Sequence, residues 1–191
     1  YESFLSTAWP LLKEAALPVT LFLTTQPINS QKKGYLGWSQ IKTLAEAGVS
    51  IGLKAHSQRR LATLTTQEIT REIETARTLI FKNLGVTPIA FAFPYGLASE
   101  TAQNVVQAQG YKAAFGQHSG VLHRQTYRYY LPRFSFTDAY GDLDRFRTVV
   151  NAMALPVADL TPTNPLLSAN INPPNIGFTI SPTVTNVDSL T

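Results

Sequence analysis

The sequence predicts an α/β domain built on a parallel sheet or barrel, because short apolar runs alternate along the chain with amphipathic helical segments. The 191 residues are 44% hydrophobic and 15% charged, which is enough to bury one sizeable core. The chain is too short for two ordinary domains with linkers. We therefore expect one domain followed by a tail.

Helical and strand patterns alternate from the first residues onward. Apolar residues fall at helical spacing over 4–15, and Pro18 ends that helix before a buried strand predicted at 19–23. A polar loop that contains Pro27 follows. The segment 38–47 again has one apolar face and predicts the second helix.

The second strand and the longest helix come next. Gly48 supplies a stop for the preceding helix, and the run 49–53 predicts a short strand. Thr65 and Glu68 form a capping box ahead of apolar positions at helical spacing. This pattern predicts a long amphipathic helix that stops at Gly85.

Two further strands complete the alternating region. The run 88–93 predicts a strand that the turn 94–96 closes, and a helix over 100–109 precedes a strand at 111–115. Residues 127–136 are expected to be extended and aromatic, followed by a helix over 143–153. The side chains expected to face inward from this last helix are Phe146, Val149 and Val150.

The composition changes at Leu155, where a Thr- and Asn-rich segment without helical period begins. Its prolines are Pro156, Pro162, Pro165, Pro173, Pro174 and Pro182. We therefore predict a domain at 1–154 and an extension at 155–191, in which a Pro-rich linker runs into the first strand or two of a β module near 176–180.

Composition excludes several kinds of site. The chain has no Cys, so disulfides, thiolate nucleophiles and thiolate metal sites are excluded, and a metal would need His and carboxylate ligands. The three histidines are His56, His118 and His123. The net charge of +4 comes from scattered Lys and Arg, which does not predict nucleic-acid binding. No apolar stretch approaches the roughly 20 residues that span a bilayer.

The working groups of an α/β barrel lie at the carboxyl ends of its strands, here 53–60, 93–96 and 116–120. These segments belong to an ordered set of stretches that resembles the polysaccharide deacetylases of carbohydrate esterase family four over 1–136. The stretches are 1–4, 11–13, 18–22, 48–52, 93–96, 110–120 and 131–133. The later ones resemble the branch that deacetylates biofilm poly-N-acetylglucosamine.

The resemblance implies an incomplete (β/α) barrel of the deacetylase type that lacks its first strand, followed by a short irregular or β extension. It implies a hydrolase that removes N-acetyl groups from an N-acetylated polysaccharide, located outside the cytoplasm or at the cell envelope. Family members hold zinc or another divalent metal with one Asp and two His, use a second Asp as base, and stabilise the oxyanion with a backbone N–H. The family's Thr-Phe-Asp-Asp-Gly motif would precede Tyr1.

The second metal motif, His-Ser/Thr-x-x-His, can be aligned in two frames. The ungapped frame starts from 51–52 and places Lys54 and Gln58 at the two histidine positions. A rival frame starts from His56 and places Arg60 at the second position, but it needs a compensated insertion. In neither frame does a pair of His ligands remain, so we expect this chain not to bind the family's metal.

The resemblance also implies other site residues. The Tyr95 N–H corresponds to the oxyanion donor, and Arg133 could orient a carboxylate. His118 could bind sugar hydroxyls or act as an acid, although ordinary loop polarity would also explain it. The expected substrate-binding residues are Phe93, Pro94, Gly96 and Tyr129.

Three functions remain open from the sequence. The first is a deacetylase-family hydrolase whose activity in this chain is doubtful. The second is a non-catalytic relative that keeps a glycan groove, which Lys54 and Gln58 favour. The third is an unrelated α/β scaffold in which the Pro-rich tail mediates an interaction.

Overall fold

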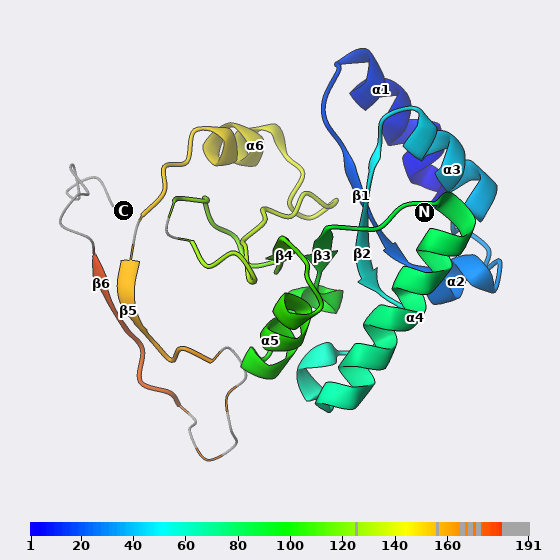
Figure 1. Ribbon diagram of the computed structural model, residues 1–191. Coiled ribbons are helices and arrows are strands. Elements are labelled where there is room, and N and C mark those ends of the chain that lie inside the picture. The colour runs from blue at the N-terminus through cyan, green and yellow to red at the C-terminus, as the bar shows by residue number, and fades with distance from the viewer. Residues whose placement is uncertain (125, 156, 165–166, 168–169, 171–172, 181–191) are drawn as a thin grey trace.

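The computed structural model describes residues 1–124, 126–155, 157–164, 167, 170 and 173–180. Four parallel strands form its main sheet in the order β1-β2-β3-β4. The strands are β1 (Thr20–Thr24), β2 (Ser50–Ala55), β3 (Ala90–Ala92) and β4 (Ala113–Phe115). The predicted α/β class and parallel sheet are therefore confirmed, and the sheet does not close into a barrel (Figure 1).

Helices connect the strands as the alternating pattern predicted. They are η1 (Phe4–Ala8), α1 (Trp9–Glu14), α2 (Thr25–Asn29), α3 (Trp38–Glu46), η2 (Leu61–Thr63), α4 (Thr66–Leu84), η3 (Pro94–Gly96), α5 (Glu100–Ala108) and α6 (Leu143–Val150). The predicted capping box begins α4: the Glu68 N–H donates to Thr65 Oγ1 at 3.3 Å, and the Thr65 N–H donates to Glu68 Oε2 at 3.0 Å. Left-handed Gly85 ends the helix.

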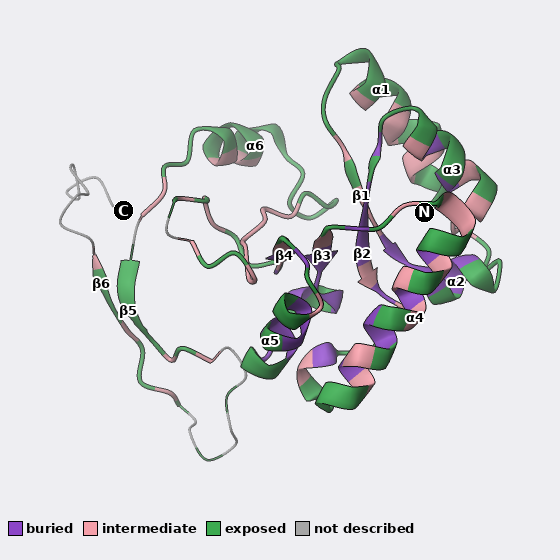
Figure 2. Cartoon of the chain, viewed as in Figure 1, coloured by how far each residue is buried: buried purple, intermediate pink, exposed green. Residues whose placement is uncertain are grey.

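The core lies between the central strands and the inner faces of α4 and α5. Figure 2 shows buried residues concentrated along β2, α4 and α5. Among the fully buried side chains are Leu53, Ile69, Ile73, Ile80, Phe91 and Val106. Each contributes about 1.5–3 kcal/mol relative to an exposed position. This packing holds the carboxyl ends of the strands in place.

Helix α2 corrects the prediction of a polar loop around Pro27. Proline is tolerated here because it lies in the first turn, where backbone N–H groups have no partner within the helix. Thr25, Pro27 and Ile28 are buried, so this face of the helix packs against the interior. The short helix follows β1 directly, which places Thr25 and Gln26 at the carboxyl edge of the sheet.

Two expectations for the second half were wrong. Residues 127–130 form a turn instead of continuing an aromatic strand, and Leu131 makes an isolated parallel bridge to Phe115. Helix α6 forms, but Phe146 is 48% exposed and Val150 59% exposed, so these side chains do not face a core. Figure 1 shows the reason: α6 lies well away from β1, β2 and the helices beside them.

The extension contains two short antiparallel strands, β5 (Val157–Thr161) and β6 (Gly177–Ile180). They lie far from β1 and β2 (Figure 1). Pro156, Pro165, Pro182 and the rest of 181–191 lie outside the described residues, and the domain boundary at 154 stays a prediction. Within the described ranges, no helix combines the length and the apolar character needed to cross a membrane.

Candidate functional site

The end of β2 is irregular at the position of Lys54. Leu23 pairs with Leu53 and Thr24 pairs with Ala55, so Lys54 is the extra residue of a bulge. Ala55 is fully buried and has a φ of 124°, a backbone conformation that a residue with a Cβ rarely adopts. Such strain persists only where the surrounding packing imposes it. The bulge turns Lys54 toward the carboxyl edge of the sheet.

Three cavities lie in a row at this edge, and neighbours share walls. The first, which we call the aromatic cavity, has a volume of about 150 Å³; Tyr1, Tyr35, Lys54 and Gln58 line it above an apolar floor that includes Leu23. The second, the outer cavity of about 330 Å³, shares Tyr35 and Gln58 with it. The third, the cationic cavity of about 280 Å³, shares Lys54.

Hydrogen bonds organise the aromatic cavity. The Tyr1 and Tyr35 ring centroids lie 4.8 Å apart, and the Tyr35 hydroxyl donates to the Tyr1 hydroxyl at 3.3 Å. Gln58 Nε2 donates to the same Tyr35 oxygen at 3.2 Å. The pKa of Tyr1 is raised, first by its hydrogen bond with Tyr35 and then by the charge of Tyr35.

The cationic cavity is lined by Lys54, Gln117, Arg133 and residues 134–137. Arg133 Nε donates to Gly116 O at 2.8 Å, and the guanidinium lies over the rings of Phe22 at 5.6 Å and Phe115 at 5.9 Å. These contacts hold Arg133 in one orientation.

The charges in the cationic cavity repel one another. Burial lowers the pKa of Lys54, and the charge of Arg133 lowers it further. Burial also lowers the pKa of Arg133. The ion pairs among the described residues are Arg59–Glu68 and Arg147–Asp144, so neither Lys54 nor Arg133 has a carboxylate partner there.

The turn 93–96 has a fixed geometry. The Gly96 N–H donates to Phe93 O at 2.9 Å, and Tyr95 adopts a left-handed conformation with φ 58° and ψ 10°. Pro at the second position and a left-handed residue at the third are typical of a type II turn. The closing bond uses the Gly96 N–H, so the Tyr95 N–H is not part of it. The Tyr95 side chain is 53% exposed.

Neighbouring loops hold this turn from below. Gly96 has a φ of 71°, and a Cβ added there would lie 2.4 Å from the Cβ of Gln117. The Tyr130 hydroxyl donates to Gly96 O at 2.9 Å. Phe93 and Pro94 are fully buried beneath the turn and so define its position instead of facing solvent. Gln117 therefore links the turn to the cationic cavity.

His118 and Tyr129 are not among the residues that line these three cavities. The exposed His118 side chain packs against Tyr130, with ring centroids 4.7 Å apart, and the partial desolvation lowers its pKa. Tyr129 packs against the core and against Tyr127, with centroids 5.8 Å apart. Their functional roles stay predictions.

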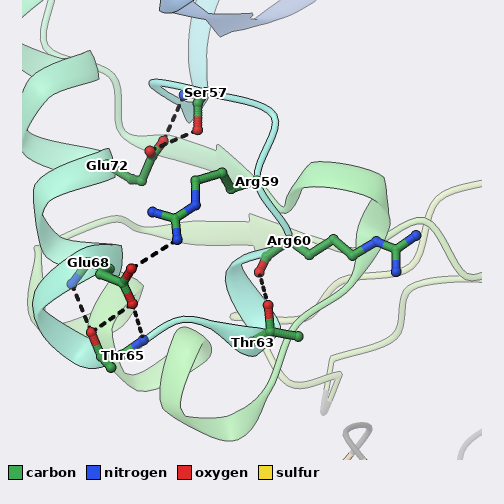
Figure 3. Close-up of polar contacts among 7 residues, drawn as sticks. All are labelled: Ser57, Arg59, Arg60, Thr63, Thr65, Glu68 and Glu72. Atoms are coloured by element: carbon green, nitrogen blue, oxygen red, sulfur yellow. Dashed lines mark hydrogen bonds and ion pairs between the residues drawn. The ribbon is translucent and has the colours of Figure 1, made fainter.

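His56 lies in a different environment from Lys54 and Gln58. Its Nδ1 is 2.9 Å from Thr25 Oγ1, and the ring lines a separate cavity with residues of α4. Figure 3 shows the loop that follows: Ser57 donates from its N–H to Glu72 Oε2 at 2.7 Å and from its hydroxyl to Glu72 Oε1 at 2.8 Å. The loop is thus anchored to α4.

Arg59 and Arg60 diverge from this anchored loop. Arg59 Nη2 lies 2.9 Å from Glu68 Oε1, whereas the Arg60 side chain points away from Ser57 and Glu72 (Figure 3). The ungapped frame pairs Lys54 and Gln58, which line a common cavity, whereas His56 of the rival frame lines a cavity to which Arg60 does not contribute.

A divalent metal does not fit the residues that are present. The part of the chain that the structure describes contains no cluster of three or more His, Asp or Glu arranged to hold a metal ion. Lys54 and Arg133 also make the edge of the sheet positive, and Gln58 offers at best a neutral carbonyl. Coordination of a cation at this position would have to overcome both charges.

Sequence reasoning missed Tyr1, Tyr35 and Gln117. Tyr35 lies in a polar loop without periodicity, and its place depends on how the chain after α2 returns to the sheet. Tyr1 reaches the cavity because the Glu2 N–H donates to Gly34 O at 3.0 Å. No local pattern predicts such a contact between distant segments. A Tyr in a loop at the expected strand edge was the only available signal.

Comparison with known proteins gives a consistent result. Residues 1–114 match the family described as polysaccharide deacetylase. A curated relative, the poly-β-1,6-N-acetyl-D-glucosamine N-deacetylase of Staphylococcus aureus, is 21% identical over 149 residues, which cover 72% of this chain and 51% of the relative. The chain thus spans about half the length of the curated relatives it matches.

Solved structures share the fold. The Streptococcus pyogenes deacetylase PplD, solved in complex with acetate, superposes with a TM-score of 0.66 at 21% identity, covering 69% of this chain and 58% of that one. A Bacillus anthracis pseudoenzyme of carbohydrate esterase family four superposes with a TM-score of 0.52 at 16% identity, covering 59% and 38%. At these identities the likeness establishes the fold alone.

Proposed function

The chain belongs to the polysaccharide deacetylase family, and on that premise we propose that it binds an N-acetylated amino-sugar polysaccharide along the carboxyl edge of its sheet. The observation that carries the proposal is the row of three cavities with shared walls. A linear polymer needs consecutive subsites, and a row of small cavities supplies them. The curated relatives are named as deacetylases of such a polymer.

The chemistry of the walls supports a sugar ligand. Tyrosine rings stack on the apolar faces of sugars, while their hydroxyls and the Gln58 amide exchange hydrogen bonds with sugar hydroxyls and N-acetyl groups. Tyr1 and Tyr35 are held together by their contact, so little rotamer freedom remains to be lost on binding. An exopolysaccharide ligand would place the protein outside the cytoplasm or at the cell envelope.

Binding without hydrolysis is the function that the geometry supports best. Metal-assisted hydrolysis needs anionic or imidazole ligands, and the positions available here hold Lys54 and Gln58 beside Arg133. The second candidate, a hydrolase acting on N-acetyl groups, is favoured by one observation, the turn at Tyr95, whose N–H is outside the closing bond. Zinc or another divalent metal would be the cofactor of that activity.

Calorimetric titration with N-acetylglucosamine oligomers tests the binding proposal. We expect the protein to bind these oligomers and Tyr35→Ala to weaken binding about 3- to 10-fold, the loss expected for one aromatic contact. Phe178→Ala is the control, because Phe178 is an exposed aromatic residue on β6, far from the site. Absence of binding, or equal losses in both variants, would exclude this groove as the glycan site.

Acetate release from the same oligomers distinguishes the two candidates. We expect no release by the full-length protein above a heat-treated control, with or without added zinc. Release that a chelator abolishes would establish the hydrolase and would reject the non-catalytic assignment.

A further inference from the structure

Two cations converge in the cationic cavity without a carboxylate among the described residues to neutralise them. Lys54 reaches it from the bulge of β2, and Arg133 reaches it from the segment after the Leu131 bridge. Like charges that are partly withdrawn from water are unfavourable unless an anion compensates them. The arrangement is therefore that of an anion subsite, and it occupies the edge where the family's metal would lie.

The orientation of Arg133 is suited to a planar anion. Its Nε–H donates to Gly116 O, its faces lie over Phe22 and Phe115, and among the described residues none accepts a hydrogen bond from Nη1 or Nη2. Two parallel donors of this kind match the two oxygens of a carboxylate. Lys54 adds a point charge from the neighbouring strand and three further donors. A carboxylate could thus contact both cations at once.

The cavity also continues into the proposed glycan groove. Lys54 lines both the aromatic and the cationic cavity, so a group bound beside Arg133 would lie next to a sugar bound beside Tyr35. The Gln117 side chain, whose Nε2 donates to Ser135 Oγ at 3.1 Å, supplies neutral hydrogen-bonding groups on the far wall. The cationic cavity thus offers neutral as well as charged hydrogen-bonding groups and adjoins a carbohydrate subsite.

We propose that Lys54 and Arg133 form a subsite for a carboxylate carried by the polysaccharide, so that the preferred ligand is an acidic glycan in which N-acetylated sugars are accompanied by uronate units. The glycan part of this proposal rests on the proposed function, whereas the anion subsite stands on the geometry of the two cations. The two parts are tested separately.

The first experiment follows the Arg133 Nε–H signal by NMR during titration with sodium glucuronate, sodium acetate, inorganic phosphate and neutral glucose. We expect glucuronate and acetate to move the signal, glucose to leave it unchanged, and Lys54→Met to weaken the carboxylate response at least fivefold. A signal that responds to phosphate but not to carboxylates would overturn the carboxylate assignment. A signal that no anion moves would show that added anions do not bind beside Arg133 and would also overturn the proposal.

The second experiment compares calorimetric affinities for a neutral N-acetylglucosamine oligomer and for an oligomer of equal length that alternates N-acetylglucosamine with glucuronate. We expect the acidic oligomer to bind about tenfold tighter in low salt and the advantage to shrink as salt rises. Lys54→Met should abolish the advantage, measured as the ratio of the two affinities within the same variant. Lys42→Met, which removes an exposed cation from α3, should preserve both affinities.

The outcomes separate the two proposals. Equal affinities for both oligomers would reject the acidic glycan while leaving the proposed function intact. If neither oligomer binds but acetate moves the Arg133 signal, the proposed function fails and the subsite serves free carboxylates.

Discussion

Lys54 and Arg133 line one cavity, and the charge of Arg133 is the second cause, after burial, that lowers the pKa of Lys54. The two residues come from segments that are far apart in the chain. Because two positively charged side chains share this cavity, the carboxyl edge of the sheet is suited to an anion and unsuited to a metal cation. The proximity of the two charges also has consequences for stability that can be measured.

Lys54→Met is expected to stabilise the protein at neutral pH. Because the folded pKa of Lys54 is lowered, its charged form destabilises the folded state, and this penalty is relieved as pH rises from the lowered pKa toward the unfolded value near 10.5. Removal of the charge should raise the free energy of unfolding at pH 7 by about 0.5 kcal/mol, a small value because solvent screens a partly exposed group. Urea denaturation at several pH values measures it.

The matched variant is Lys42→Met, which removes an exposed charge and should not show this pH-dependent gain. A gain at Lys54 that persisted unchanged above pH 10.5 would contradict the electrostatic explanation, because the two states then bind equal numbers of protons.

Gly96→Ala is expected to destabilise the protein by about 2–4 kcal/mol, since a left-handed backbone and a steric clash act together. The new Cβ would lie 2.4 Å from Gln117 Cβ and 2.6 Å from the Gln117 N atom. Chemical denaturation measures the change. Gly85→Ala is the control, because Gly85 is also left-handed but has open space around it, so that only about 1 kcal/mol should be lost. Equal losses would show that the contact with Gln117 has no energetic effect.

Glu68→Gln is expected to change how stability depends on pH in acid. Hydrogen bonds from the Thr65 N–H, Arg59 and the Thr65 hydroxyl lower the pKa of Glu68 to about 2. A lowered carboxyl pKa contributes stability that is present above the unfolded value of 4.5 and is lost as pH falls toward 2. Thermal melts between these limits should therefore fall less steeply for Glu68→Gln. Identical slopes in variant and parent would argue against a capping role for the charged carboxylate.

Two designed variants distinguish the alignment frames of the metal motif. Lys54→His combined with Gln58→His places two imidazoles on the wall of one cavity, so this variant should bind Zn²⁺ more tightly than the parent in equilibrium dialysis. Arg60→His would complete the rival motif with native His56, but Arg60 points away from that loop (Figure 3), and no gain is expected. Tighter zinc binding by Arg60→His alone would support the rival frame.

Local patterns predicted most of the sheet and its helices. Alternating apolar runs, the Thr65–Glu68 capping box and the stop at Gly85 act over a few residues, and all of them appear in the structure. Helix α6 shows where such reasoning ends. Its periodicity predicts a helix, and a helix forms. Periodicity does not show, however, whether another element of the protein packs against the apolar face of that helix.

The candidate site was only partly predictable for a related reason. The strand ends, Lys54, Gln58 and the turn at Tyr95 follow from short motifs. Tyr1 and Tyr35, in contrast, reach the site through a contact between the N-terminus and a loop more than thirty residues later, such as the hydroxyl contact of 3.3 Å. The pairing of Lys54 with Arg133 depends on the bulge in β2 and on the bridge at Leu131. Neither has a local signature.

The Lys54 side chain forms part of the wall of both the aromatic and the cationic cavity, so any movement of this side chain changes both cavities. Because Lys54 lines both cavities, an occupant of the aromatic cavity that displaces its side chain would alter the shape and charge of the cationic cavity, and an anion in the cationic cavity would attract the same side chain. Thermodynamic reciprocity then requires that each occupant change the affinity for the other by the same factor. The affinity for a sugar and the affinity for an acidic group would therefore be coupled through the displacement of a single flexible side chain.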